Sequence, residues 1–261
     1  MRKPNTLKKR LKQGEAVFGP WCVLPSSAVA NITAAAGMDF IIIDMEHGPA
    51  SFETAEDMVR AMESEGCCPL VRVGDRTEST ILRALDIGAH GVIAPHVESG
   101  ADAQDVVSFV KYWPLGTRGF SPYTRAGGYG GGDITAHADR ENQETLTAVI
   151  LEGKAGLANL EAILSVSELD LVYIGAYDLS QAMGMPGQVG RPEIKSEMER
   201  CIRIIRDAGV AAGGYVAKNR DDMRWMLDIG MQFITYLPDV TVIFKAFEDG
   251  VKQFRDALEK R

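Results

Sequence analysis

Acidic side chains follow two of the apolar segments of this chain, close to where each segment ends. Glu152 comes directly after the run Thr147–Leu151, and Asp178 follows the run Leu169–Ile174. Two carboxylates that meet in a folded protein repel each other unless a proton or a cation lies between them. Oxygen ligands completed by water and substrate suit a hard divalent ion such as Mg²⁺ or Mn²⁺. The alternative is that Asp178 caps a turn and Glu152 has no special role.

A second polar group follows the apolar run Phe40–Ile43, which is succeeded by Asp44, Glu46 and His47. Histidine exchanges protons near neutral pH, and a nearby acid can fix its tautomer and support the imidazolium. Asp44 and His47 are therefore candidates for an acid–base pair, although a single histidine is more often structural.

Arg72 interrupts the apolar run Pro69–Val73, where a guanidinium is costly to bury without an anionic partner. One interpretation is a clamp for a substrate carboxylate or enolate. The other is an internal salt bridge, for instance to Glu46. Aromatic or basic groups also end other apolar runs, namely Trp21, His96 and Lys218.

Eight short apolar runs position these residues. They are rich in β-branched residues and do not alternate cleanly with polar ones, which indicates strands buried on both faces. The runs are Ala16–Trp21, Phe40–Ile43, Pro69–Val73, Gly91–Pro95, Thr147–Leu151, Leu169–Ile174, Ala211–Val216 and Phe233–Leu237. Helical patterns fill most of the gaps. This order predicts an α/β fold of the (β/α)8 TIM-barrel type, with a doubly wound sheet as the alternative. In such a barrel, catalytic residues lie at the carboxyl ends of the strands.

Residues 1–261 are expected to form a single barrel domain with a long segment at about 112–146. A segment of this length is usually a lid, an interface or partly disordered. Its "GGYGGG" lacks the ending of a phosphate loop, so we interpret it as a flexible hinge. His137 in this segment receives no role, and His90, before the fourth run, is interpreted as structural.

The composition limits the classes of function. Asp and Glu number 36 against 28 Lys and Arg, for a net charge of −8, which argues against a nucleic-acid binder. The four cysteines form no CxxC pair and are expected to be reduced. The first residues lack the apolar core of a signal peptide, and no apolar run approaches the ~20 residues needed to span a bilayer. We therefore expect a cytoplasmic protein with neither a nucleic-acid nor a membrane partner.

Several long motifs occur in a fixed order: "GMDFIIIDMEHGP", "LVRV", "LDIGAHGVIAPHVES", "YWPLGTRG", "VILEG", "GLANLEAI" and "YIGAYDLSQAMG". Together they resemble the HpcH/HpaI family of metal-dependent (class II) pyruvate aldolases, over nearly the whole chain. The resemblance implies a (β/α)8 barrel of the phosphoenolpyruvate/pyruvate-binding type. It also implies a homo-oligomer, either a hexamer or a trimer of swapped dimers, in which the C-terminal helix is exchanged between subunits.

The resemblance further implies roles for the residues at the strand ends. Glu152 and Asp178 would hold a divalent metal (Mg²⁺, Mn²⁺ or Co²⁺), which pyruvate would chelate. Arg72 would stabilise the enolate oxygen. Asp44 and His47 would form an acid–base dyad acting through a metal-bound water, with Glu46 behind them. The substrate would be bound by Arg72 and by Trp21, His96, Gly175, Ala176 and Tyr177.

The chain departs from the family pattern at several positions. Ile150 replaces a glutamine that can touch pyruvate, and Gly153 replaces a threonine or serine. His96 stands in "PHV" where "PMV" is common, and Tyr177 in "GAYDLS" where "GPADLS" is common. These changes leave the expected metal and enolate residues in place but affect the region of the second substrate.

The resulting hypothesis is an aldolase, a carbon–carbon lyase that cleaves or forms 4-hydroxy-2-oxo acids from pyruvate and an aldehyde. The alternative is a citrate-synthase-like condensation of oxaloacetate with acetyl-CoA, in which His96, Arg118 and Arg125 would serve a more anionic substrate. A non-catalytic metabolite-binding barrel is less favoured, because the chain retains Glu152, Asp178, Arg72 and His47. A Schiff-base aldolase using Lys218 is also less favoured, because the carboxylate pair already offers an electrophilic site.

Overall fold

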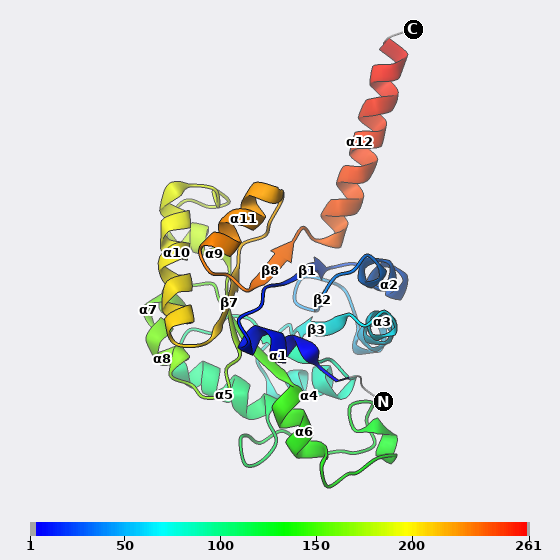
Figure 1. Ribbon diagram of the computed structural model, residues 1–261, viewed down its shortest axis with the longest axis vertical. Coiled ribbons are helices and arrows are strands. Elements are labelled where there is room, and N and C mark those ends of the chain that lie inside the picture. Colours follow the sequence, from blue (N-terminus) through cyan, green and yellow to red (C-terminus); the bar gives the residue numbers. More distant parts are fainter. Residues whose placement is uncertain (1–3, 260–261) are drawn as a thin grey trace.

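Eight parallel strands close into a barrel in the order of the sequence, in a computed structural model that describes residues 4–259 (Figure 1). The strands are β1 (Val17–Cys22), β2 (Phe40–Asp44), β3 (Cys68–Arg72), β4 (Gly91–Ala94), β5 (Leu146–Leu151), β6 (Leu171–Ile174), β7 (Ala211–Gly214) and β8 (Phe233–Tyr236). β1 pairs with β8 and thereby closes the sheet. Each predicted run overlaps one strand, and the predicted (β/α)8 barrel is confirmed.

Helices alternate with the strands, and most of them cover the outside of the barrel. They are α1 (Thr6–Lys12), α2 (Ser27–Ala35), α3 (Phe52–Ser64), α4 (Glu78–Asp86), α5 (Gly100–Val110), α6 (His137–Glu144), α7 (Lys154–Ala158), α8 (Leu160–Leu164), α9 (Ala176–Ala182), α10 (Pro192–Asp207), α11 (Arg220–Asp228) and α12 (Asp239–Glu259), with a 3-10 turn at Gly128–Gly130. Side-chain caps start several of them: Ser51 accepts from the N–H of Thr54, and Thr77 from that of Thr80. These caps fix where the chain leaves the strand ends and enters each helix.

The barrel interior is filled by large side chains. Phe40 and Phe233 stack with ring centroids 3.9 Å apart, and Trp21 meets Tyr173 edge to face at 5.6 Å. A second apolar layer lies between the strands and the surrounding helices. In the register of β2 and β3, Asp44 pairs with Arg72, so both side chains reach the same end of the barrel.

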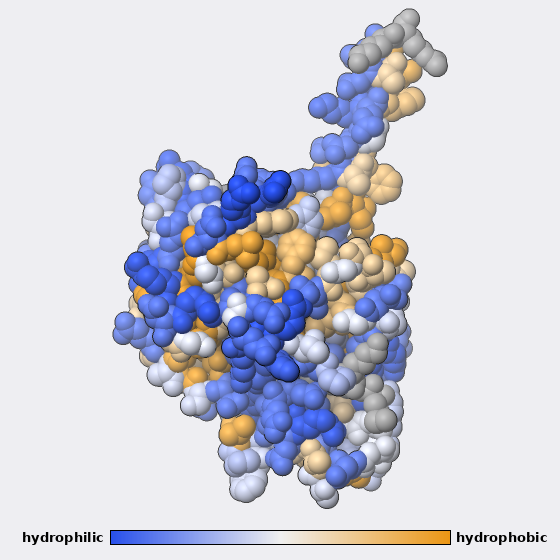
Figure 2. Space-filling view, in the orientation of Figure 1, coloured by the Kyte–Doolittle hydropathy of each residue, from blue (hydrophilic) through white to orange (hydrophobic). Residues whose placement is uncertain are grey.

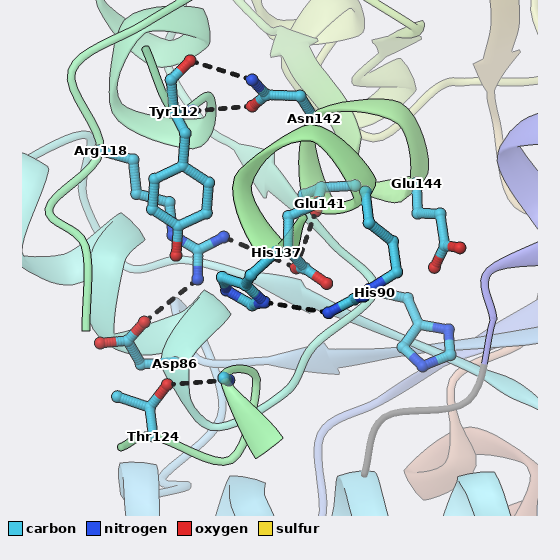
Figure 3. A network of polar contacts seen from close by, with 12 residues as sticks. Asp86, His90, Tyr112, Arg118, Thr124, His137, Glu141, Asn142 and Glu144 are labelled. Carbon is cyan, nitrogen blue, oxygen red and sulfur yellow. Dashed lines mark hydrogen bonds and ion pairs between the residues drawn. The ribbon is translucent and has the colours of Figure 1, made fainter. Parts of the chain in front are cut away.

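The long segment at 112–146 lies at the opposite end of the barrel from the carboxyl ends of the strands. Buried Arg118 lies between Asp86, where α4 ends, and Glu141 of α6 (Figure 3). Its Nη2 is 3.1 Å from Oδ1 of Asp86, and its Nη1 is 3.8 Å from Oε2 of Glu141. Arg125 of the same segment pairs with buried Glu63. Both arginines are thus used within the fold. The interpretation that they serve an anionic substrate at the mouth of this barrel is wrong, and the segment is not a lid over that mouth.

Helix α12 projects away from the barrel (Figure 1). Its apolar side chains are exposed, including Phe244 (65%), Phe247 (75%) and Phe254 (65%). Figure 2 shows apolar residues along one side of this helix and hydrophilic ones along the other. Among residues 4–259, no helix is both long enough and apolar enough to cross a membrane.

Candidate active site

Two carboxylates flank one glycine at the carboxyl ends of β5 and β6. Glu152 follows β5, and Asp178 lies in the first turn of α9, after β6. Gly175 lies between them: a Cβ atom there would be 3.2 Å from Cγ of Glu152 and 3.4 Å from Oδ2 of Asp178. The backbone N–H of Gly175 donates to the carbonyl of Leu151 at 2.9 Å, which fixes its position. The convergence of these two acids, expected from their place after neighbouring strands, is therefore present.

The electrostatics of this pair favour a cation. Burial raises the pKa of Glu152, and the negative charges of Glu46 and Asp178 raise it further, against a lowering effect of His96. A divalent ion would offset both the burial of the carboxylate and the repulsion from its negative neighbours. Carboxylate oxygens are suitable donors for Mg²⁺ or Mn²⁺. In the described part of the chain, no three His, Cys, Asp or Glu side chains are placed to hold a metal ion together. A cation on Glu152 and Asp178 would therefore need substrate and water oxygens to complete its coordination.

Arg72 is held by two acids and an aromatic ring. Its Nε donates to Oδ1 of Asp44 at 2.9 Å, and its Nη2 pairs with Oδ2 of the same carboxylate. Its Nη1 lies 3.1 Å from Oε2 of Glu46, and the guanidinium lies 4.5 Å from the centre of the Trp21 ring. The salt bridge to Glu46 considered from the sequence is present. Arg72 also lines the cavity described below.

Asp44 and the ring of His47 do not meet. Oδ1 of Asp44 accepts the backbone N–H groups of Glu46 and His47, each at 3.1 Å. The His47 side chain is 70% exposed, and its Nε2 lies 4.0 Å from Oε2 of Glu46. Asp44 thus positions the loop that carries His47 rather than its imidazole, and the acid–base dyad stays a prediction.

His96 lies beside both Glu46 and Glu152. Its Nε2 is 3.0 Å from Oε1 of Glu46, and its Nδ1 is 3.4 Å from Oε2 of Glu152. Its backbone N–H donates to Oε1 of Glu152 at 3.2 Å. Glu46 therefore lies at the centre of the polar residues, in contact with Arg72 and His96.

One cavity of about 320 Å³ joins these groups. Its lining includes most of the residues expected from the sequence, namely Trp21, Asp44, His47, Arg72, Glu152, Gly175, Ala176, Tyr177 and Asp178. The first N–H groups of a helix have no partner within it, so the start of α9 offers donors to an anion in this cavity. His96 lies at the neighbouring rim rather than in this cavity, in a second hollow that shares Glu152 and Asp178.

Sequence reasoning missed two tyrosines of the cavity wall. The Tyr173 hydroxyl donates to the carbonyl of Tyr215 at 2.8 Å, and its ring supports Trp21. Tyr215 has a left-handed backbone, with φ at 63°. A tyrosine within the aliphatic strand "LVYI" is the signal that could have identified Tyr173. Lys218 is exposed and does not line this cavity.

An arginine and paired carboxylates at the carboxyl ends of the strands define a barrel enzyme, because active sites of (β/α)8 barrels lie at that end. The HpcH/HpaI aldolase/citrate lyase family matches residues 18–246, and the chain belongs to this family. It is 36% identical to a hydroxypyruvate/pyruvate aldolase from Roseobacter denitrificans over 92% of this chain and 93% of that one. It is 32% identical to a 2-keto-3-deoxy-L-rhamnonate aldolase from Salmonella gallinarum, over 96% and 93%. The expected family and the expected class of enzyme are confirmed.

Two solved structures are also similar to this chain. A citrate synthase, SbnG, is 26% identical and superposes with a TM-score of 0.88 over 97% of this chain and 98% of that one. The citrate lyase beta subunit from M. tuberculosis, complexed with oxaloacetate and magnesium, is 14% identical with a TM-score of 0.55, over 87% and 93%. The second likeness shows a shared fold alone.

Proposed function

We propose that this protein is a divalent-metal-dependent aldolase that cleaves or forms 4-hydroxy-2-oxo acids through an enolate of pyruvate. The observation that carries the proposal is the placement of Glu152 and Asp178 on either side of Gly175, in the cavity that Arg72 also faces. This geometry supports a cation bound beside a fixed positive charge within one small volume. The aldolase names of the similar proteins support the same class of reaction.

In the cleavage direction, the C4 hydroxyl loses its proton, the C3–C4 bond breaks, and the electron pair passes to the enolate oxygen. Glu152 and Asp178 would hold Mg²⁺, Mn²⁺ or Co²⁺, which would act as a Lewis acid on the keto oxygen. Arg72 stabilises the negative charge that develops on that oxygen. Its three contacts with Asp44 and Glu46 fix its direction in advance. The N–H groups at the start of α9 receive the substrate carboxylate.

His47 is the proposed proton carrier. It lines the cavity with Arg72 and is open to solvent, so it can exchange protons between the substrate hydroxyl and bulk water. Asp44 assists by holding the backbone of His47 and the guanidinium of Arg72 at once.

A pyruvate-release assay tests the proposal. Protein stripped with EDTA is assayed with a panel of 4-hydroxy-2-oxo acids and lactate dehydrogenase, before and after addition of Mn²⁺ or Mg²⁺. We expect turnover only with metal, and a loss of at least ~100-fold in kcat for Glu152→Gln and for Arg72→Met. Glu144→Gln, which removes a carboxylate at the opposite end of the barrel, is the matched control and is expected to retain activity. Unchanged turnover in both site variants would refute the proposal.

The condensation of oxaloacetate with acetyl-CoA is the second candidate, because the SbnG citrate synthase superposes on nearly the whole chain. Thiol release from acetyl-CoA in the presence of oxaloacetate distinguishes the two reactions. We expect pyruvate release to exceed thiol release, and the reverse result would favour the condensation.

We also propose that α12 packs on a second copy of this chain. Its exposed phenylalanines form an apolar side that a monomer would leave in water. Phe247→Asp is expected to lower the mass measured by analytical ultracentrifugation, whereas Lys252→Asp on the same helix is expected to leave it unchanged. An unchanged mass of the Phe247 variant would contradict this packing.

A further inference from the structure

The backbone of His96 adopts an unusual conformation at the carboxyl end of β4. Its φ is 54°, in the left-handed region that favours glycine and costs free energy for other residues. Such a conformation persists when surrounding contacts maintain it, and it is enriched at functional sites. Here the conformation directs the backbone N–H and the imidazole of one residue toward the same pair of carboxylates.

His96 can donate one hydrogen bond to each of these carboxylates. The backbone N–H donates to Oε1 of Glu152 at 3.2 Å. The ring contact with Oε1 of Glu46, at 3.0 Å, is shorter than the 3.4 Å contact with Oε2 of Glu152, so we assign the ring N–H to Nε2. The lone pair of Nδ1 then lies beside Oε2 of Glu152, and these two acceptors repel each other. A cation bound at Glu152 would reduce this repulsion.

These contacts connect Glu152 to the ion pair of Glu46 and Arg72. Glu152 is linked through His96 to Glu46, and Glu46 is linked to Arg72 by an ion pair of 3.1 Å. Glu46 and Glu152 carry like charges that repel, and the imidazole lies between them. Removal of the ring would let the two carboxylates reorient independently, so the oxygens that face the cavity would no longer be fixed.

We propose that His96 is a positioning residue that aligns Glu152 for the divalent cation and ties it, through Glu46, to Arg72. This role rests on the proposed cation site. It requires no contact between His96 and the reacting carbons. It also accounts for a histidine at a position whose backbone would suit glycine or asparagine better.

Binding of Mn²⁺ alone, measured by isothermal titration calorimetry, tests the role without an activity assay. Loss of a residue that hydrogen-bonds a metal ligand typically costs 10–100-fold in metal affinity. We expect His96→Gly, which keeps the left-handed backbone but removes the ring, to weaken Mn²⁺ binding at least ~10-fold. We expect His96→Gln to recover part of the loss, because its amide nitrogen can take the place of Nε2 and donate to Glu46. Lys218→Met, which removes an exposed basic side chain, should bind Mn²⁺ like the wild type.

A double-mutant cycle supplies the specific readout. If His96 acts through Glu46, adding His96→Gly to Glu46→Gln should weaken Mn²⁺ binding by much less than it does in the wild type. Wild-type affinity in His96→Gly, with only its melting temperature changed, would overturn the proposal and leave a purely structural role. If wild-type protein fails to bind Mn²⁺, or Glu152→Gln binds it normally, the cation site itself is refuted, and the role of His96 falls with it.

Discussion

Substitution of Arg72 by methionine is expected to destabilise the fold as well as the active site. The Arg72 side chain is 13% exposed and pairs with Asp44 (3%) and Glu46 (10%). Without the guanidinium, two largely buried carboxylates lose their cationic partner. Breaking a buried ion pair by removing one member typically costs ~3–5 kcal/mol, because the remaining charge is left uncompensated. We expect a loss in this range in the free energy of unfolding, measured by urea denaturation at neutral pH.

The next arginine along the chain provides a matched control. Arg76 pairs with Asp102 at 2.6 Å, but the two side chains are 32% and 27% exposed. A solvated pair of this kind typically contributes ~0–1 kcal/mol, so Arg76→Met should cost little. The double variant Arg72→Met with Asp44→Asn should recover part of the lost stability, because it removes one of the unpaired charges. Equal losses for the two arginines would refute the argument that burial makes the Arg72 pair costly to break.

Three further predictions concern separate features. Gly175→Ala should leave the melting temperature nearly unchanged but weaken Mn²⁺ binding several-fold, because the new methyl group would displace Glu152; unchanged binding would contradict the flanking geometry. Burial alone would raise the pKa of Glu63, but hydrogen bonds from His90 and Arg125 outweigh burial and lower it to about 2. The contacts of Glu63 therefore stabilise the fold fully above the usual pKa of a glutamate, and this stability is lost as pH falls toward 2. Glu63→Gln should make the melting temperature fall less steeply at acid pH. An unchanged fall in the variant would argue against this role of Glu63. Borohydride treatment with pyruvate should leave Lys218 unlabelled in a mass spectrum, and an adduct there would restore the Schiff-base alternative.

The barrel was predictable because its signals are local and repeated. Each strand is a short apolar run, and each gap carries helix starts and stops. The rule that parallel strands present their carboxyl ends at one rim then brought Glu152 and Asp178 together without any knowledge of distances. This rule could not place the segment at 112–146. That segment contains no strand, and its course is set by buried pairs such as Arg118 with Asp86, which no spacing in the sequence reveals.

The sequence predicted which residues lie at the carboxyl ends of the strands better than it predicted which of them contact each other. Asp44 and His47 are close in sequence, which favoured a dyad, yet Arg72 is the neighbour of Asp44 across the sheet. A permanent charge that can form two bonds to one carboxylate outcompetes an imidazole exposed to water. Competition of this kind depends on the register between β2 and β3, and the sequence does not state that register.

The choice of the second substrate depends on residues that buried contacts do not fix. The residues proposed to form the enolate lie at or just after the carboxyl ends of β2, β3, β5 and β6. The register of β2 and β3 pairs Asp44 with Arg72, and Gly175 lies between Glu152 and Asp178. Tyr177, one of the positions that depart from the family pattern, is instead exposed at the rim. Substitutions there can change which aldehyde is accepted without disturbing the buried contacts that hold Arg72. We therefore expect the pyruvate half of the reaction to be the part shared with relatives, and the acceptor to be the part specific to this chain.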